Sequence, residues 1–208
     1  MTMGVEEGMQ KPEFDQIDPA TFSHEDRYKF LTATVVPRPI ALVTTIGSSG
    51  VLNAAPYSQF IIIAASPALL GIVVGQTPDG DKDTLRNIKE SGDYVINTVS
   101  EAMADQVQLC AFPFPAHVSE VQEAGFTIER SVVVKPMRIA QAPIQFECRL
   151  HRMIEFGTSR ATLVVGEVML VHAAKGLVSA HQVDHAKLRP LGRISGRRYC
   201  LTQQTVDA

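Results

Sequence analysis

The sequence predicts a mainly β protein, an antiparallel barrel with a few flanking helices. Apolar runs rich in β-branched residues follow one another closely, for example residues 60–65 and 68–75 on either side of Ser66-Pro67. Neither run alternates apolar with polar residues, which predicts burial on both faces. Helix and strand patterns do not alternate regularly, as they would in a doubly wound sheet. The phosphate-binding patterns GxGxxG, GxxxxGKS and GxxxxGKT are absent, which further favours a barrel.

Length and composition limit the class of protein. With 208 residues, 45% of them hydrophobic and 20% charged, the chain suffices for one domain with a sizeable core. The net charge of −3 offers no basic surface, and no apolar run reaches the roughly 18–20 residues that span a bilayer. We therefore expect neither nucleic acid nor membrane as a partner. The acidic N-terminus and three widely spaced cysteines predict a cytoplasmic protein without disulfides.

A predicted hairpin at residues 37–60 is the centre of the expected site. Residues 40–46 form its first strand, and the Gly/Ser cluster at 47–50 forms its turn. Because Asn, Ala and Pro are poor strand formers and Pro56 has no N–H, we expect the returning limb to leave the sheet near Asn53. Its small side chains and free backbone groups would then face a ligand.

The flanking helices are predicted from capping residues and apolar periodicity. Ser23, followed by Asp26, begins a short helix. Asp83 or Thr84 caps a second helix, which Gly92 ends. The other expected elements are strands at residues 94–99, 132–137, 144–154 and 161–172, a helix at 101–110, a short helix at 118–124, and a basic, Gly-punctuated tail at 184–201.

Several short segments together resemble a known family. The segments are, in order, PRPIALVTT (37–45), NAAPYS (53–58), Ser66-Pro67, KDTLRNI (82–88), YVINTV (94–99), APIQFEC (142–148) and GRISGRRY (192–199). They resemble the flavin reductase-like family, whose fold is an FMN-binding split β-barrel of antiparallel, Greek-key type. The resemblance implies a domain at residues 23–202 between an N-terminal arm at 1–22 and a C-terminal tail at 203–208.

The resemblance also implies an activity and an assembly. Members are homodimers with a flavin near the interface, and they reduce flavin with NADH or NADPH. FMN is the expected flavin, ahead of FAD. Hydride would pass from the nicotinamide to flavin N5, a step that the cofactors carry without a general acid or base, so no catalytic residue is predicted. The electron acceptor would be a monooxygenase or another protein.

Two alternative functions stay open at this point. The chain could be an FMN-binding electron-transfer flavoprotein that does not itself oxidise a nicotinamide nucleotide. It could also be a barrel that has lost its flavin and serves as an interaction module, although the retained motif residues speak against this.

The phosphate of FMN needs backbone N–H groups, hydroxyls and cations. The resemblance assigns Lys82 and Thr84 to the phosphate at a helix N-terminus, where the unpaired amides favour an anion, while Asp83 orients the loop or caps the helix. The simpler interpretation is that Asp83-Thr84 only caps the helix and Lys82 is solvated. Arg38, between Pro37 and Pro39, is interpreted as a phosphate or ribityl contact, with a surface salt bridge as the alternative.

The returning limb of the hairpin supplies the remaining expected contacts. The residues expected to line the flavin ring edge and the phosphate are Asn53, Ala54, Ala55, Pro56, Tyr57 and Ser58. Thr44 and Thr45 lie on the facing strand, where only one of them can point to the ligand, and the sequence leaves open which. This chain has Gln59 where relatives usually have an aromatic residue, and Ser195 where they often have glycine.

The basic tail and the histidines give weaker indications. Arg193 is interpreted as facing the cofactor or the nicotinamide nucleotide, in a tail that closes over the flavin. A solvated basic face is the alternative. His181 and His185 are four residues apart, with Asp184 beside them, but this spacing alone does not indicate a metal, and no metal site is predicted.

Overall fold

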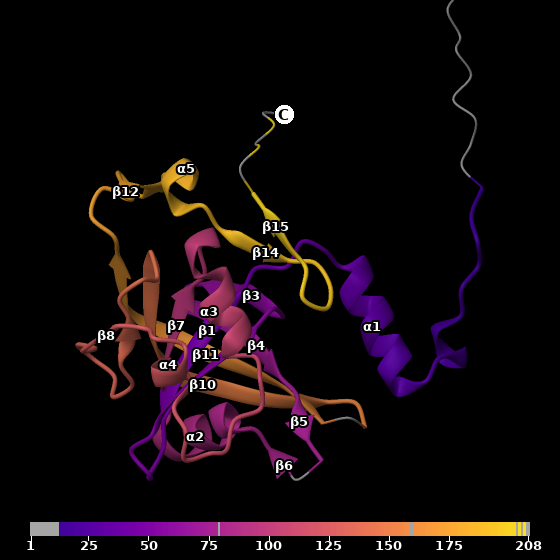
Figure 1. Ribbon diagram of the computed structural model, residues 1–208, viewed down its shortest axis with the longest axis horizontal. Helices are drawn as coiled ribbons and strands as arrows, with labels where there is room; N and C mark the ends of the chain where they lie inside the picture. The colour runs from indigo at the N-terminus through magenta and orange to yellow at the C-terminus, as the bar shows by residue number, and fades with distance from the viewer. Residues whose placement is uncertain (1–12, 79, 159, 203, 205, 207–208) are drawn as a thin grey trace, which may run out of the picture.

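A seven-stranded antiparallel sheet dominates the computed structural model, which describes residues 13–208 except 79, 159, 203, 205 and 207–208 (Figure 1). The strand order is β2-β1-β7-β10-β11-β4-β3. The strands are β1 (Ala41–Ile46), β2 (Leu52–Tyr57), β3 (Phe60–Ala65), β4 (Ala68–Val74), β7 (Asp93–Thr98), β10 (Ile144–Phe156) and β11 (Ala161–Ala173). The predicted mainly β, antiparallel fold class is confirmed.

Short helices and two-stranded hairpins surround this sheet. The helices are η1 (Pro19–Thr21), α1 (His24–Thr34), α2 (Asp83–Ser91), η2 (Glu101–Met103), α3 (Ala104–Leu109), α4 (Glu120–Glu123) and α5 (His185–Leu188). The small hairpins pair β5 (Gln76–Thr77) with β6 (Gly80–Asp81), β8 (Ile128–Glu129) with β9 (Arg138–Ile139), β12 (Val178–Ser179) with β13 (Gln182–Val183), and β14 (Leu191–Arg193) with β15 (Tyr199–Leu201). No helix in the described part of the chain is long and apolar enough to cross a membrane.

Local capping signals fix two helix ends as predicted. The Ser23 side chain accepts a hydrogen bond from the backbone N–H of Asp26 at the start of α1. At the end of α2, Gly92 takes a positive φ of 72°, and its N–H bonds the carbonyl of Ile88. The expected tail at 184–201 is more ordered than predicted, because it contains α5 and the β14–β15 hairpin.

The sheet curls so that its two edge strands, β2 and β3, follow each other in sequence without pairing in the described residues. Tyr57 at the end of β2 packs in one cluster with Leu70 and Ile72 of β4, across the opening. The opening is the split of the barrel, and Ser58-Gln59 cross it.

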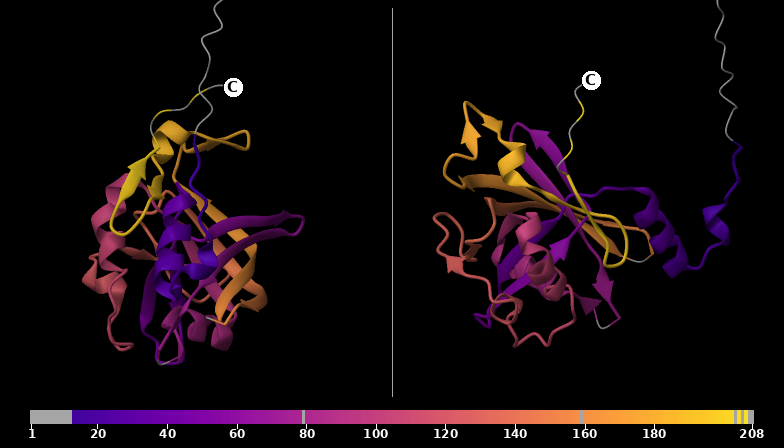
Figure 2. Two further views of the ribbon diagram at one scale, coloured as in Figure 1. Left: turned by 90° about the vertical axis from the view of Figure 1, so that its right-hand side faces the viewer. Right: turned by 45° about the horizontal axis from the view of Figure 1, so that its top comes forward.

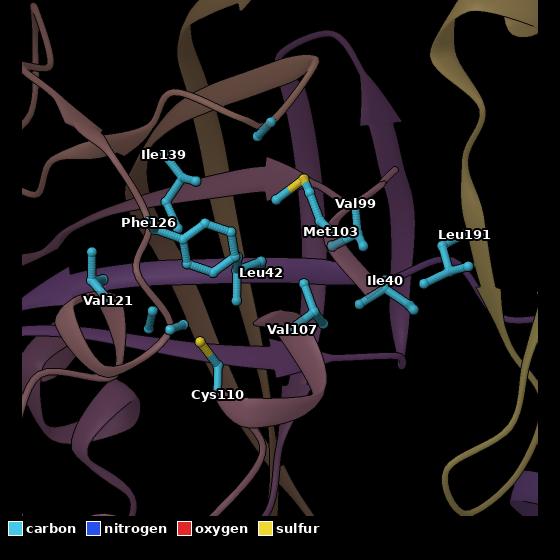
Figure 3. Close-up of a cluster of buried hydrophobic side chains, with 13 residues drawn as sticks. Ile40, Leu42, Val99, Met103, Val107, Cys110, Val121, Phe126, Ile139 and Leu191 are labelled. Carbon is cyan, nitrogen blue, oxygen red and sulfur yellow. The ribbon is translucent and has the colours of Figure 1, made fainter. Parts of the chain in front are cut away.

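Two buried clusters lie on the two sides of β1. Ala41 and Val43 face the barrel interior, where they pack with Leu85 and Ile88 of α2. Leu42 faces the other side, where α3 and α4 cover the sheet (Figure 3). Both faces of β1 are covered, which agrees with the apolar residues 41–43 that do not alternate with polar ones.

The limb that was predicted to leave the sheet near Asn53 stays in it. Strand β2 pairs with β1 over its whole length, with Asn53 opposite Thr45 and Pro56 opposite Leu42. The prediction is wrong because β2 is an edge strand, where proline is tolerated since the missing N–H interrupts no second ladder.

The outer edge of β2 is also not free for a ligand. The hydroxyl of Ser119 donates to the carbonyl of Leu52 at 2.6 Å, and the N–H of Ala54 donates to the buried carboxylate of Glu120 at 3.0 Å. The start of α4 therefore satisfies the backbone groups that we expected to face a ligand.

Strand β3 is exposed, contrary to the predicted burial on both faces. Ile61, Ile62 and Ile63 are 53%, 80% and 39% exposed. As the second edge strand, β3 pairs only with β4 among the described residues, and the β3–β4 hairpin extends beyond the rest of the fold (Figure 2). Strand β4 is mostly buried, as expected.

The predicted strand at 132–137 is a loop. The N–H groups of Val132, Val133 and Val134 donate to the fully buried carboxylate of Glu147, at 2.8, 2.6 and 3.1 Å. His172 Nε2 lies 2.6 Å from the same carboxylate. Because these N–H groups turn toward one side chain, they cannot join a strand ladder, and only the short β8 and β9 flank the loop.

Candidate functional site

A pocket of about 700 Å³ opens between the sheet, α1 and the β14–β15 hairpin. Figure 1 shows α1 standing at one side of the sheet, with the turn of the hairpin beside it. The predicted site residues that line this pocket are Arg38, Pro56, Tyr57, Ser58, Lys82 and Arg193. The fold thus brings together residues from four separate places in the sequence.

Arg38 is buried at the wall of the pocket, and its guanidinium mainly binds protein atoms. Nε donates to the Ser58 hydroxyl at 3.2 Å. The two terminal nitrogens donate to the backbone carbonyls of Thr32, Val35 and Ile194. Burial lowers the pKa of Arg38, and the nearby Arg193 lowers it further. At most one of its five N–H donors remains for a ligand.

Lys82 is the N-cap residue of α2, and its side chain makes no capping bond. The prediction that Asp83 or Thr84 caps the helix is therefore wrong. Asp83 is the first helical residue and forms an ion pair with Arg86. The side chain of Lys82 lines the pocket, and partial desolvation lowers its pKa although the residue is exposed. An ammonium group at a helix N-terminus is suited to an anion.

The charge of the pocket is unbalanced. Within the described residues, Arg38, Lys82 and Arg193 form no ion pair with a carboxylate. The acidic residue that lines the pocket, Glu25, pairs with Lys29 at 2.6 Å. Three cations without acidic partners at one cavity favour binding of a ligand with two negative charges.

The β14–β15 hairpin contributes an aromatic wall that sequence reasoning missed. Arg193 donates to the hydroxyl of Tyr199 at 2.6 Å, and its guanidinium carbon lies 4.8 Å from the centre of that ring. The Tyr199 hydroxyl bonds Gln108 of α3 at 3.0 Å, which fixes the hairpin to the helix. The sequence predicted a flexible basic tail at this segment and not a hairpin, and only Arg193 was selected from it. Residues of α1, among them Thr32, were missed because its sequence carries no ligand signal.

The Tyr57 hydroxyl is buried and lies near the hydroxyl of Thr84, although the two groups do not form a well-aligned hydrogen bond. Burial raises the pKa of this phenol to about 12, although the contact with Thr84 lowers it, so the group is neutral near pH 7.

The other predicted residues lie away from this pocket. Thr44 is buried and donates to the carbonyl of Met137 at 2.7 Å. Thr45 accepts from the amide of Asn53 at 3.2 Å, and that amide also donates to Thr84 at 3.0 Å. Ala54 and Ala55 lie within β2. Neither Thr44 nor Thr45 lines the main pocket. The expectation that one of the two faces the ligand is therefore not met at this pocket.

A second, smaller cavity of about 330 Å³ lies on the outer side of α2. Asn53 and Asp83 line it, together with residues of the β1–β2 turn and of segment 116–118. The cofactor-binding roles of the residues outside the main pocket stay predictions. The described residues contain no group of three or more side chains able to hold a metal ion.

Comparison with known proteins identifies the family. The family model described as "Flavin reductase like domain" matches residues 33–191. The chain belongs to the flavin reductase-like family. The matched range contains all the predicted site residues except Arg193, which follows it closely.

Solved structures of this family support the same fold. Nitrilotriacetate monooxygenase component B from Bacillus cereus is 33% identical with a TM-score of 0.91, over 95% of this chain and 100% of that one. The 2-nitrobenzoate 2-nitroreductase NbaA from Pseudomonas fluorescens is 35% identical with a TM-score of 0.85, over 93% and 95%. A split barrel domain from Shewanella frigidimarina, 18% identical with a TM-score of 0.83 over 95% and 98%, shows the fold alone. The predicted split-barrel fold is confirmed.

Proposed function

We propose that this chain is an oxidoreductase that binds FMN in the main pocket and reduces it with NADH or NADPH. The observation that carries the proposal is Lys82, which lines the pocket at the start of α2 and, like Arg38 and Arg193, has no acidic partner in the described residues. The volume of about 700 Å³ lies within the range of cofactor pockets. Membership of the flavin reductase-like family supports a flavin-related activity.

The residues present fit such a cofactor. Lys82 and the first amides of α2 would hold the phosphate, and Arg193 would lie beside either the flavin or the nicotinamide nucleotide. Ser58 offers a hydroxyl at the same wall. When bound, FMN supplies a site that accepts a hydride, so the chain has to bind, orient and shield rather than move protons.

We also propose a homodimer and a separate electron acceptor. The exposed isoleucines of the edge strand β3 form an apolar surface that a second copy of the chain would cover. The similarity to a protein named component B of a monooxygenase suggests an oxygenase as the acceptor of electrons.

A visible spectrum followed by anaerobic titration with NADH and NADPH tests the activity. Bound flavin that bleaches on addition, or colourless protein that oxidises the nucleotide only when FMN is supplied, would support the proposal. Yellow protein that does not bleach would refute the reductase activity and support the alternative, an electron-transfer flavoprotein. Protein that neither binds flavin nor oxidises either nucleotide would refute it.

A further inference from the structure

Two walls of the main pocket are formed by α1 and by the β14–β15 hairpin, and the hairpin is anchored to the core through Leu191 and to α3 through Tyr199. No residue of α1 is buried, although its exposed and half-buried side chains form one side of the pocket. The β14–β15 hairpin forms a separate two-stranded sheet and contributes Arg193, Gly196 and Tyr199 to another side. Both walls lie outside the seven-stranded sheet, and Figure 2 shows them beside each other.

Arg38 connects both walls to the barrel. Its guanidinium donates to the carbonyls of Thr32 and Val35 at the end of α1, the second at 2.7 Å. It donates to the carbonyl of Ile194 in the hairpin at 3.1 Å, and to Ser58 on the barrel side at 3.2 Å. One buried side chain therefore joins three segments that are distant in sequence.

The backbone adds a second connection at the same residue. The N–H of Arg38 donates to the carbonyl of Arg193 at 3.0 Å, and the N–H of Arg193 donates to the carbonyl of Arg38 at 2.8 Å. This pair fixes the hairpin to the chain but does not reach α1. The connection between α1 and the hairpin thus depends on the guanidinium.

Only arginine provides this geometry. A planar fork presents five donors in fixed directions, whereas the single ammonium of lysine cannot reach acceptors on opposite sides. Because carbonyl and hydroxyl oxygens already take four of those donors, the charge of Arg38 is held by protein dipoles and not by a carboxylate.

We infer that Arg38 is a positioning residue that holds α1 and the β14–β15 hairpin together over the flavin pocket, and not a direct phosphate ligand. The flavin part of this inference rests on the proposed function. The part that concerns the two walls does not.

The test is Arg38→Lys, which keeps the charge and removes the fork. Hydrogen exchange of the apoprotein should become at least about tenfold faster in both α1 and residues 191–201, with β7 and β10 unchanged. Flavin affinity should fall at least about tenfold, since one lost hydrogen bond to a charged group has that effect. Retained flavin affinity in Arg38→Lys would show that the charge alone matters and would overturn the inference.

Arg27→Lys is the matched control. Arg27 donates to the carbonyls of Pro19, Ala20 and Phe22 before α1, and it does not line the pocket. This variant should leave exchange in residues 191–201 and flavin affinity unchanged. If Arg27→Lys loosens the hairpin as much as Arg38→Lys does, the inference is wrong.

A measurement on the unchanged protein covers the case that Arg38→Lys fails to fold. In native-state hydrogen exchange with increasing urea, amides of α1 and of the hairpin should share one opening free energy below that of the barrel. Independent opening of the two segments would overturn the connection. If wild-type protein binds no flavin, the proposed function fails, while the exchange data still decide the role of Arg38.

Discussion

At the scale of single residues, the site is defined by positive charge without a local counter-charge. Lys82 shows this most clearly, because its ammonium lines the pocket and has no carboxylate within ion-pair distance in the described residues. Desolvation lowers its pKa, so an anion beside it would favour the charged form.

Replacing Lys82 by methionine should therefore weaken flavin binding. We expect a loss of about tenfold in affinity, the effect of one hydrogen bond between charged groups, together with a weaker dependence of binding on salt. Quenching of flavin fluorescence at two ionic strengths measures both.

The matched control is Lys89→Met on the same helix. Lys89 pairs with Asp81 at 2.6 Å and does not line the main pocket, so its loss changes the net charge equally without touching the site. Equal losses in the two variants would mean that the net charge of the protein, and not Lys82, attracts the flavin.

At the scale of elements, one buried carboxylate prevents a predicted strand from forming. Glu147 gathers the N–H groups of residues 132–134 and so turns a β-branched stretch into a loop. Burial alone would raise the pKa of Glu147, but the N–H groups of Val132 and Val133, with the contact to His172, outweigh burial and lower it. Arg138, 3.9 Å away, also faces the carboxylate.

The stabilisation by Glu147 should depend on pH. Because its pKa in the folded protein lies below the unfolded value of about 4.3, the contribution is complete above that pH and is lost as pH falls through the folded pKa. Glu147→Gln should cost about 2 kcal/mol of unfolding free energy at pH about 6 and less at pH about 3.5. Urea unfolding of both proteins measures the difference, and a difference that does not change with pH would contradict this account.

At the scale of the whole molecule, the edge strand β3 is an exposed apolar surface. Three consecutive isoleucines are exposed on a strand whose outer N–H and C=O groups have no partner strand in the described residues. Such an edge invites pairing or aggregation unless another surface covers it, and stable interfaces bury roughly 1,000 Å² or more.

If a second copy covers β3, Ile62→Glu should produce a monomer. Ile62 is the most exposed of the three at 80%, so the change should leave the fold intact, and light scattering after gel filtration should give half the wild-type mass. Ile128→Glu, at a 47% exposed position on β8 across the fold, should leave the mass unchanged. A wild-type protein that is already monomeric would refute the dimer.

The sequence by itself determined the order of elements and the family. Ser23 and Gly92 act on the helix ends next to them, and the apolar runs of β1, β4 and β7 are buried as their composition predicts. These signals are readable because capping and strand propensity act within a few residues along the chain.

Only the tertiary structure decided which motif residues meet at one pocket and which faces are covered. Arg38, Lys82 and Arg193 converge there, whereas Thr44 and Thr45 belong to the core. The loop at 132–137 depends on Glu147, which lies 15 residues beyond Val132 in the chain. The physical reason is the same in each case: burial and convergence depend on pairing between segments distant in sequence, which local composition does not encode.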